Sequence, residues 1–336
     1  MPPKTKTLNP SRITFIVLGL CLVGFAAVAF IQVTKDQPTP IEEEEVDFGV
    51  VPNFGQIPFD GPRTLADLTT LCEFGPRPSG SEAMRKQQDF LEKHFSDLGA
   101  RVVRQTFRVR HPVDGSAVEM VNLIIQWHPE TKERYLVCAH YDTRPFPDQD
   151  RTNPRGRFVG ANDGASGTAV LMELGRQMKD LTGKNGVDFV LFDGEELVFS
   201  ERDEYFLGST YFSRAYRQAP PGYRYRQGVL LDMVGDINLR IRQEQNSLRL
   251  ARSLVSDVWG AAARLGVREF EPVLGPNVRD DHLPLNNTAG IPTCDVIDFE
   301  YPYWHTEADT PDKCSAASLE KVGKTVHEWL RVTLNR

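Results

Sequence analysis

Five short apolar runs alternate along this chain with longer segments of helical periodicity. Each run is rich in β-branched and aromatic residues and too short for a helix, which is typical of strands buried on both faces of a sheet. The alternation predicts an α/β fold, a single domain whose central, twisted, mostly parallel mixed sheet is flanked by helices on both faces. The predicted strands are 122–127, 134–140, 187–193, 228–234 and 291–298, and the predicted helices include 165–181, 208–217, 246–265 and 316–334.

The N-terminal part of the chain departs from this pattern. Residues 13–33 form a run of 21 uncharged, mostly apolar residues, which is long enough to span a bilayer as a helix. Basic residues precede the run, so residues 1–12 are expected to stay cytoplasmic and the remainder to lie outside the cytoplasm. We therefore predict a transmembrane signal anchor at 13–33. A cleaved signal peptide that ends near Ala27-Val28-Ala29, followed by secretion, is the alternative.

A stretch rich in proline and glutamate follows the apolar run. Residues 34–62 carry five prolines and the acidic sequence EEEE, a composition typical of a solvated tether. The folded domain is accordingly predicted to occupy residues 63–336.

Charge and cysteine content exclude two classes of protein. The formal net charge is −7 and no basic stripe with interleaved aromatics is present, so nucleic-acid binding is not expected. The cysteines outside the apolar run form no CxxC pair, which excludes a zinc ribbon. Export would permit disulfides, and buried free thiols are the equal alternative. These cysteines are Cys72, Cys138, Cys294 and Cys314.

Polar side chains collect where the predicted strands end. An acidic residue after a strand is, taken singly, more often a helix cap or a turn former than a ligand. In open α/β sheets, however, ligands bind beyond the carboxyl ends of the strands, so the whole set predicts a functional site at that edge. Its members are His140, Asp142, Asp163, Asp193, Glu195, Glu196, Asp232, Asp280, Asp281, His282 and His305.

Histidine and carboxylate groups without cysteine suit a catalytic zinc ion with an open coordination position. The adjacent Glu195 and Glu196 would be unfavourable if both were buried and unpaired. A metal resolves this conflict, because one glutamate coordinates it while its neighbour serves as general base and acid. Asp142, two residues beyond a strand-end histidine, is predicted to orient that imidazole. The hypothesis is a zinc site that includes Asp163, Glu196 and His305.

Six motifs occur in a fixed order: HYDTRP, GANDGASG, FDGEE, LLDMVGD, RDDHLPL and YWHTEADTPDK. With them the chain resembles the zinc aminopeptidase clan (M28-type), and most closely its animal-type glutaminyl cyclase branch, over roughly residues 62–335. The resemblance implies the zinc exopeptidase/glutaminyl cyclase fold and an enzyme that acts on peptide or protein N-termini.

The cyclase branch implies one zinc ion, held by the equivalents of Asp163, Glu196 and His305. It also implies that Glu195 moves a proton, that Asp280 hydrogen-bonds Glu195 and that Trp304 lines the pocket. Three features of this chain favour the branch: the eleven residues LVFSERDEYFL between GEE and GS, the Asp-Asp-His triplet, and the tryptophan directly before the last histidine.

The aminopeptidase branch implies two zinc ions and a Glu195 that activates a water molecule. Its five ligand positions fall on His140, Asp163, Glu196, Asp232 and His305, and all are filled here. The sequences NDGASG and TPDK also look more like those of aminopeptidases. In a cyclase, His140 and Asp232 remain without a second metal, and Asp232 is then expected to serve catalysis.

The chain departs from the animal cyclases at three places. A pocket histidine of that branch falls on Asp295, and the pocket tryptophan expected after GEE is missing, with Phe199 close by. The two positions of the animal disulfide fall on Ala139 and Thr168. The resemblance therefore implies a substrate-binding set of Trp304, Asp295 and Phe199 that differs from that of the animal enzymes.

The first functional hypothesis is a zinc-dependent glutaminyl-peptide cyclotransferase, which converts N-terminal glutamine to pyroglutamate and releases ammonia. The alternative is a co-catalytic dinuclear zinc aminopeptidase that removes N-terminal residues. A third reading, a catalytically inactive membrane-tethered binding domain, would be signalled by loss of Glu195 or His305, and both are present. The expected partners are peptide or protein N-termini and, through the anchor, a membrane.

Overall fold

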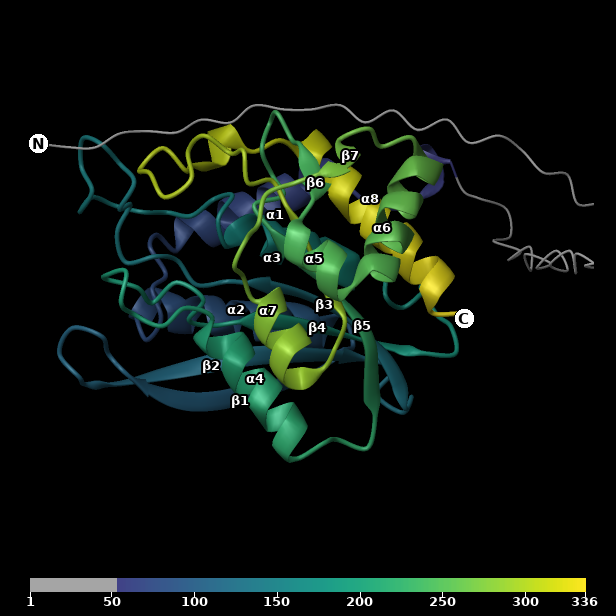
Figure 1. Ribbon diagram of the computed structural model, residues 1–336, viewed down its shortest axis with the longest axis horizontal. Coiled ribbons are helices and arrows are strands. Elements are labelled where there is room, and N and C mark those ends of the chain that lie inside the picture. Colours follow the sequence, from purple (N-terminus) through teal and green to yellow (C-terminus); the bar gives the residue numbers. More distant parts are fainter. Residues whose placement is uncertain (1–52) are drawn as a thin grey trace, which may run out of the picture. The chain divides into compact units, whose positions relative to one another are not determined.

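A six-stranded mixed sheet organises residues 53–336, which are the residues that the computed structural model describes (Figure 1). The strand order is β1-β2-β4-β3-β5-β8; the last four strands in this order are parallel, whereas β1 and β2 form an antiparallel pair beside β4. The predicted α/β domain with a mixed sheet is confirmed. The strands are β1 (Arg101–Arg110), β2 (Ala117–Trp127), β3 (Glu133–His140), β4 (Gly186–Phe192), β5 (Arg224–Asp232) and β8 (Thr293–Ile297).

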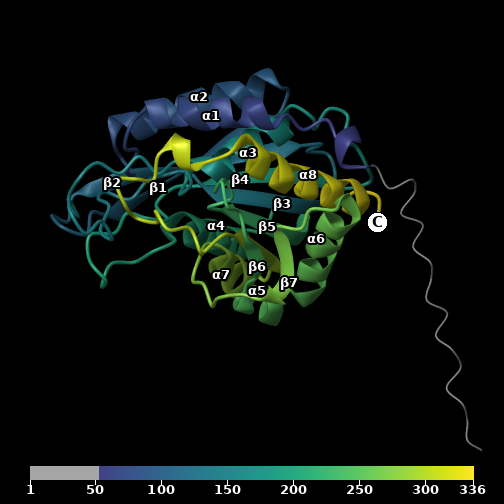
Figure 2. The same cartoon turned by 90° about the horizontal axis from the view of Figure 1, so that it is seen from above.

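Helices cover both faces of the sheet, as the view in Figure 2 shows. One face carries α1 (Gly61–Glu73), α2 (Glu82–Asp97), α3 (Ala165–Gly175) and α8 (Ala316–Thr333), with α6 (Arg252–Leu265) packed against α8. The other face carries α4 (Leu207–Gln218), α5 (Gln245–Leu250) and α7 (His282–Pro284). Smaller elements are η1 (Phe54–Gln56), η2 (Leu285–Ala289), η3 (Pro311–Lys313) and a two-stranded parallel sheet of β6 (Ile241–Gln243) and β7 (Phe270–Leu274).

The central strand β3 shows why both faces must be covered. Its side chains alternate between the two faces, and every residue from Arg134 to His140 is buried. Tyr135, Val137 and Ala139 pack in the large core beneath α1, α3 and α8, whereas Leu136 and Cys138 pack in a second core beneath α4. A continuously apolar strand therefore corresponds here to a strand that is covered on both sides.

Several elements differ from the sequence-based expectation. The stretch 246–265 was predicted as one helix, but it forms α5 and α6, which are separated at Ala251, where φ is −142°. Strand β1 was not predicted, because as an edge strand it alternates exposed and partly buried residues instead of showing an apolar run. Helix α1 was not predicted either; it begins after Asp60, whose carboxylate accepts a hydrogen bond from the Arg63 N–H at 2.9 Å.

The folded part reaches back into the range predicted as a tether. Ile57 and Phe59 are buried in the large core, with 3% and 4% of their surface exposed. The predicted cytoplasmic segment 1–12, the anchor 13–33 and most of the tether lie outside the described residues. Within residues 53–336, no helix is both long and apolar enough to cross a membrane. The four cysteines of this range, Cys72, Cys138, Cys294 and Cys314, are free thiols and are buried.

A buried ion pair links β3 and β4 near the start of both strands. Arg134 of β3 and Asp188 of β4 have no exposed side-chain surface, and the Arg134 Nε–H donates to Asp188 Oδ1 at 2.9 Å. The guanidinium also donates to the carbonyls of Trp127, His128 and Val187 at 2.7, 2.7 and 3.0 Å. These bonds join the β2–β3 turn to β4.

Replacing Arg134 by alanine should destabilise the domain by about 3–5 kcal/mol, because it leaves the Asp188 carboxylate buried without its partner. Lys93 forms an ion pair with Asp97 on the exposed face of α2, and Lys93→Ala is the matched control, with an expected change below about 1 kcal/mol. Guanidinium unfolding of the full-length variants measures both values. Similar losses for the two variants would contradict this account of the buried pair.

Candidate active site

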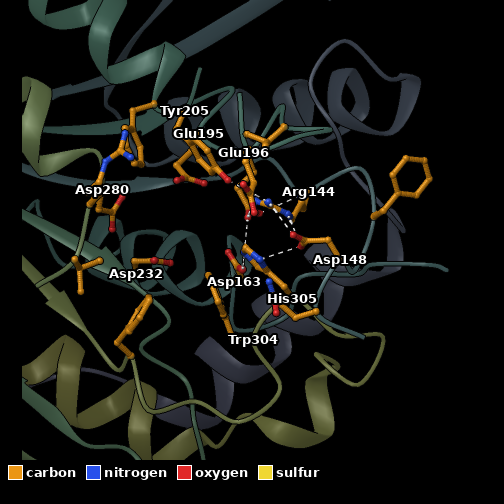
Figure 3. Close-up of a pocket in the computed structure, with 18 of the residues that line it drawn as sticks. Arg144, Asp148, Asp163, Glu195, Glu196, Tyr205, Asp232, Asp280, Trp304 and His305 are labelled. Carbon is orange, nitrogen blue, oxygen red and sulfur yellow. Dashed lines mark hydrogen bonds and ion pairs between the residues drawn. The ribbon is translucent and has the colours of Figure 1, made fainter. Parts of the chain in front are cut away.

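A pocket of about 760 Å³ opens beyond the carboxyl ends of the parallel strands (Figure 3). His140 ends β3, Glu195 and Glu196 follow β4, Asp232 ends β5, and the loop after β8 carries His305. The adjacent parallel strands β4, β3, β5 and β8 present these groups at one edge of the sheet. Asp163 joins them from the loop that leads into α3. The structure thus brings together six of the residues from which the sequence predicted a site, namely His140, Asp163, Glu195, Glu196, Asp232 and His305.

Two histidines and three carboxylates form a continuous cluster at the base of this pocket. His305 Nε2 lies 2.9 Å from Glu196 Oε1 and 3.5 Å from Asp163 Oδ2. His140 Nε2 lies 3.2 Å from Asp163 Oδ1 and 3.1 Å from Asp232 Oδ1. Asp163 therefore stands between the two imidazoles, as a carboxylate that can serve two neighbouring cation positions.

The electrostatics of this cluster favour a cation. Burial and the nearby Glu196 carboxylate raise the pKa of Asp163 to about 6. Burial acts to raise the pKa of Glu196, but the hydrogen bond with His305 and the charges of His305, Arg144 and His140 together outweigh it and lower that pKa to about 2. The pKa of His305 is raised to about 9 by Asp148 and Glu196, against the opposing effect of burial. Two carboxylates packed this closely are stabilised by positive charge, whether it comes from imidazolium or from a metal ion.

The donor set fits zinc. Ligand atoms of His140, Asp163 and Glu196 all lie within 4.8 Å of one another, and His305 contacts two of these residues. Asp163 Oδ2 is buried and has no hydrogen-bond partner in the described part of the chain, which is an acceptor left available for an ion. Nitrogen and carboxylate ligands without cysteine are those of catalytic zinc sites.

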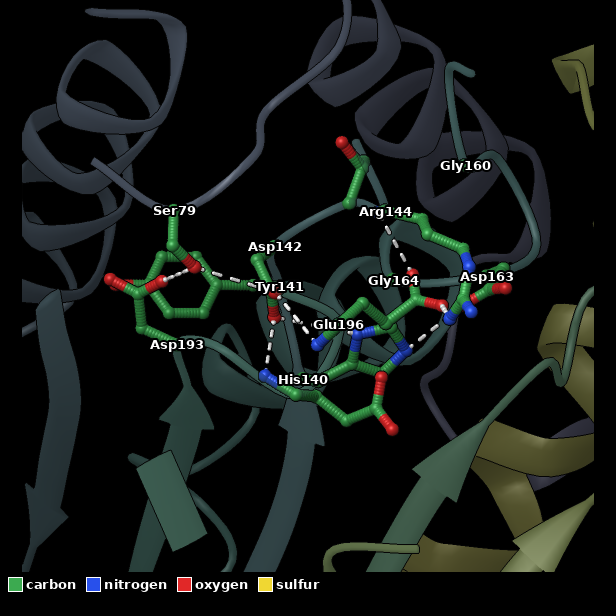
Figure 4. Close-up of polar contacts among 12 residues, drawn as sticks. Ser79, His140, Tyr141, Asp142, Arg144, Gly160, Asp163, Gly164, Asp193 and Glu196 are labelled. Atoms are coloured by element: carbon green, nitrogen blue, oxygen red, sulfur yellow. Dashed lines mark hydrogen bonds and ion pairs between the residues drawn. The ribbon is translucent and has the colours of Figure 1, made fainter. Parts of the chain in front are cut away.

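Backbone conformation holds this cluster in place at two positions. His305 has φ 54°, in the left-handed region that residues other than glycine rarely adopt, and such strain commonly accompanies functional sites. Gly164, directly after Asp163, has φ 96°, and a Cβ there would lie 2.5 Å from the Asp142 carbonyl oxygen and 3.3 Å from His140 Cε1 (Figure 4). Only glycine fits here, because the loop that carries Asp163 passes so close to the end of β3.

Asp142 lies beside His140, where the sequence predicted a partner for that imidazole: its Oδ1 faces His140 Nδ1 at 3.7 Å, an ion-pair distance. Its carboxylate also accepts hydrogen bonds from the backbone N–H groups of Glu195 and Glu196, at 3.2 and 3.0 Å (Figure 4). Asp142 therefore fixes the turn that presents both glutamates to the pocket.

Behind Asp142 lies a second buried carboxyl. The Ser79 hydroxyl donates to Asp193 Oδ1 at 2.7 Å and lies 3.5 Å from Asp142 Oδ2. Burial and the Asp142 carboxylate raise the pKa of Asp193 to about 8. Asp193 is thus not a ligand, although it follows a strand; it supports the turn from behind.

Glu195 is placed as an acid–base group. It lines the pocket, and no hydrogen bond or ion pair joins its carboxyl to another residue of the range 53–336. Burial, followed by the neighbouring Glu196, raises its pKa well above the usual value, which suits a group that must accept and return a proton. The predicted hydrogen bond from Asp280 is not formed: Asp280 lines the same pocket, but its Oδ1 accepts the Asp281 N–H at 2.5 Å.

Aromatic side chains form the wall of the pocket. The Trp304 ring stacks on the His305 imidazole with centroids 3.9 Å apart and an interplanar angle of 27°. The segment that follows Glu196 contributes Phe199, Tyr205 and Phe206 to the lining. Trp304 and Phe199, two of the three residues predicted to bind substrate, thus lie in the pocket lining, and their contact with a substrate stays a prediction.

Asp295 does not line the pocket, and this corrects its predicted placement among the substrate-binding residues. It lies on β8, has no exposed surface, and its Oδ2 faces His282 Nδ1 at 3.7 Å. The Asp295 side chain points into the interior behind the pocket. Because every residue of β8 is buried, the sequence alone does not show which face of the sheet this side chain is on.

Arg144 is a pocket residue that sequence reasoning did not single out. Its backbone N–H donates to Glu196 Oε2 at 3.0 Å, and its Nη1 lies 3.3 Å from Glu196 Oε1. The guanidinium also contacts Asp148 at 2.7 Å and the Tyr205 hydroxyl at 3.3 Å (Figure 3). The only signal in the sequence was its place in HYDTRP, two residues after Asp142. Arg144 positions Glu196 and keeps its carboxylate ionised.

Comparison with known proteins agrees with this geometry. The profile of Peptidase family M28 matches residues 122–330. Among curated proteins, the chain is 27% identical over 313 residues to the glutaminyl-peptide cyclotransferase of Boiga dendrophila, covering 79% of this chain and 78% of the relative.

Solved structures of two kinds are similar. The glutaminyl cyclase of Fimbriiglobus ruber is 43% identical, with a TM-score of 0.80 and coverage of 84% of this chain and 99% of the other. A leucine aminopeptidase precursor from Bacteroides thetaiotaomicron is 33% identical, with a TM-score of 0.77 and coverage of 84% and 98%. The similarity to the M28-type clan and its cyclase branch, first seen in the motifs, is confirmed.

Zinc should stabilise the domain through this cluster. For the full-length chain stripped with a chelator, zinc at 100-fold above its Kd should add about 2.7 kcal/mol to the free energy of unfolding. Glu196→Gln, which removes a carboxylate predicted to coordinate zinc, should clearly reduce this gain, as measured by thermal melting with and without zinc.

Glu204→Gln is the matched control, since Glu204 is exposed and does not line the pocket. This variant should keep the full response to zinc. An equal response in the Glu196 and Glu204 variants would show that zinc binds elsewhere.

Proposed function

The chain belongs to peptidase family M28, and we propose that it is a zinc-dependent glutaminyl-peptide cyclotransferase. It would convert the N-terminal glutamine of peptides and proteins to pyroglutamate and release ammonia. The observation that carries this proposal is the aromatic lining of the pocket, to which Phe199, Tyr205, Phe206 and Trp304 contribute. Cyclisation consumes no water, whereas peptide hydrolysis requires it, so an aromatic lining favours the former.

The names of the relatives support the same choice. The similar protein of Boiga dendrophila and the similar structure from Fimbriiglobus ruber are both described as glutaminyl cyclases. The segment between Glu196 and Gly208, whose length was the first sequence feature to favour this branch, is the segment that builds the wall.

Asp163, Glu196 and His305 are the residues that would hold the zinc ion. When bound there, zinc supplies a Lewis acid that polarises the γ-carbonyl group of the substrate glutamine. The Arg144 backbone N–H donates to the other oxygen of Glu196, Oε2, at 3.0 Å, and Asp148 lies 3.1 Å from the other ring nitrogen of His305, Nδ1. This second layer of contacts fixes the orientation of the ligands.

Glu195 would carry the proton. The α-amine of the substrate attacks its own γ-carbonyl carbon, so one C–N bond forms and the bond to the side-chain amide nitrogen breaks. Glu195 removes a proton from the attacking amine and returns it to the departing nitrogen, which leaves as ammonia. The raised pKa of Glu195 suits the second half of this exchange.

Asp232 and Trp304 would position the substrate. The Asp232 carboxylate lines the pocket with 13% of its side chain exposed, where it can accept a hydrogen bond from the α-amine. Trp304 is held by its stacking on His305 and offers an apolar face to the glutamine methylene groups. Together they bend the glutamine so that amine and carbonyl meet, which lowers the entropic cost of ring closure.

A dinuclear aminopeptidase is the second candidate, and one observation favours it. His140 Nε2 lies between Asp163 Oδ1 and Asp232 Oδ1, at 3.2 and 3.1 Å, so a second ion would find three donors there. With two ions, Glu195 would take a proton from water instead of from the substrate amine. One of the similar structures is described as a leucine aminopeptidase precursor.

A peptide that begins with glutamine separates the two candidates. Incubation with the zinc-loaded full-length chain should lower its mass by one ammonia and leave the residue count intact, as read by mass spectrometry. Glu195→Gln should reduce the rate by at least about 10²-fold, because the proton carrier is lost.

Glu204→Gln serves as control and should keep the full rate. Loss of the entire first residue, from this peptide or from one that begins with leucine, would replace the cyclase by the aminopeptidase. No change in either peptide would contradict both enzymatic proposals.

We also propose that residues 13–33 anchor the protein in a membrane with the catalytic domain outside the cytoplasm, supported by 21 uncharged residues after Lys4, Lys6 and Arg12. The full-length chain should stay with the membrane fraction after alkaline extraction, whereas a chain that lacks residues 1–34 should be released. Recovery of a shortened, soluble product from the full-length chain would instead indicate signal-peptide cleavage.

A further inference from the structure

A second group of ionisable side chains extends from Asp280, which lines the pocket, into the interior behind it. Glu244, Asp281, His282 and Asp295 have no exposed surface, and Asp280 has 3%. Four of these five groups are acids and only one is a histidine. Burying so many carboxyls is unfavourable unless protons, hydrogen bonds or a cation compensate them.

Hydrogen bonds do not compensate the burial of the polar atoms at the centre of this group. Within residues 53–336, Asp280 Oδ2, both carboxyl oxygens of Asp295 and both ring nitrogens of His282 are buried without a hydrogen-bond partner. Buried polar atoms are nearly always satisfied in native proteins, so several unsatisfied atoms that face one another call for a physical explanation. An ion among them supplies one.

We propose that Asp280, His282 and Asp295 bind a divalent transition-metal ion, at a second site separate from the one at Asp163. One donor atom from each residue lies within 4.8 Å of the others. His282 Nδ1 and Asp295 Oδ2 are 3.7 Å apart, too far for a hydrogen bond. Ligands held about 2.0–2.2 Å from a tetrahedral zinc are separated by roughly 3.3–3.6 Å, close to this spacing.

The residue types select the class of ion. Calcium and magnesium take oxygen ligands almost alone, whereas an imidazole with two carboxylates suits zinc and its neighbours in the first transition row. Zinc is the ion to test first. None of the three residues is a predicted ligand of the first site.

A partner for the histidine is already in place. The opposite ring nitrogen, Nε2, faces Glu244 Oε2 at 3.4 Å, and a metal-binding histidine commonly directs its other nitrogen toward a carboxylate. Glu244 is itself fixed at the start of α5, where it accepts the N–H groups of Asn246, Ser247 and Val278 at 2.8, 2.6 and 3.0 Å. The carboxylate that faces His282 is therefore held in a fixed position.

The ion would connect this interior site to the active-site pocket. Asp280 belongs to the cluster, with its Oδ2 buried and unpartnered, and also lines the same pocket as Glu195. Asp295 is held on β8, where its N–H donates to the Ser247 hydroxyl at 2.9 Å. A metal that joins Asp280 to β8 would hold the loop 277–281 against the sheet and fix the carboxylate that faces the proposed proton carrier.

Counting zinc tests the proposal without reference to catalysis. The full-length chain is stripped with a chelator, reloaded with excess zinc, desalted and analysed for zinc per chain by elemental mass spectrometry. His282→Gln and Asp295→Asn should each retain about one zinc fewer than the unsubstituted chain, because each loses a donor of the site. His327→Gln is the matched control: this buried histidine of α8 belongs to no metal-ligand cluster found in the described residues, and its zinc count should not change.

A second variant decides the outcome even where His282→Gln does not fold. His140→Gln combined with His305→Gln removes both histidines of the first site, and this chain should still retain about one zinc, which Asp295→Asn then removes. If the double variant binds no zinc, or if His282→Gln and Asp295→Asn keep the full count, shared protons neutralise the cluster and the proposal is overturned.

Discussion

The repulsion between buried carboxylates governs the design of this domain. Asp163 and Glu196 both face His305 Nε2, at 3.5 and 2.9 Å, in an interior where unpaired charge is strongly disfavoured. The parallel strands bring these groups together at one edge, and the fold must then hold them there against their mutual repulsion. Histidines and Arg144 supply the opposite charge, and a bound metal ion would add to it, while Asp142 supplies the acceptors that hold the turn of Glu195 and Glu196.

The sequence allowed the fold class and most of the metal-site candidates to be predicted, because both depend on local signals. Strands buried on both faces are continuously apolar, and the groups that follow them must meet at the carboxyl edge. Strand β1 gave no such signal, since an edge strand with one exposed side alternates. The role of Asp142 and the burial of Asp295 depend on which atoms lie nearest in space, and spacing along the chain does not determine that. Arg144 was overlooked because a single basic residue in a loop has no pattern.

The difference between cyclase and aminopeptidase chemistry concerns the surroundings of the cluster more than the cluster itself. Both reactions use Glu195 beside Asp163, Glu196 and His305. They differ in what reaches Glu195: the amine of a folded glutamine in one case and a water molecule in the other. Phe199, Tyr205 and Phe206 line the same pocket as Glu195, whereas His140, between Asp163 and Asp232, belongs to a set of donors that a second ion could use.

The same physical reasoning applies to both metal-ligand clusters of residues 53–336, and it separates them. At the first, hydrogen bonds and ion pairs already link His140 and His305 to the carboxylates, so histidine protonation can carry part of the compensation when no metal is bound. At the second cluster, the side chains of His282 and Asp295 form no hydrogen bond that could compensate the carboxylate charge, and neither is exposed to solvent. The charge there must be compensated by protons within the cluster or by a metal ion. These two possibilities predict metal contents that differ by one ion per chain.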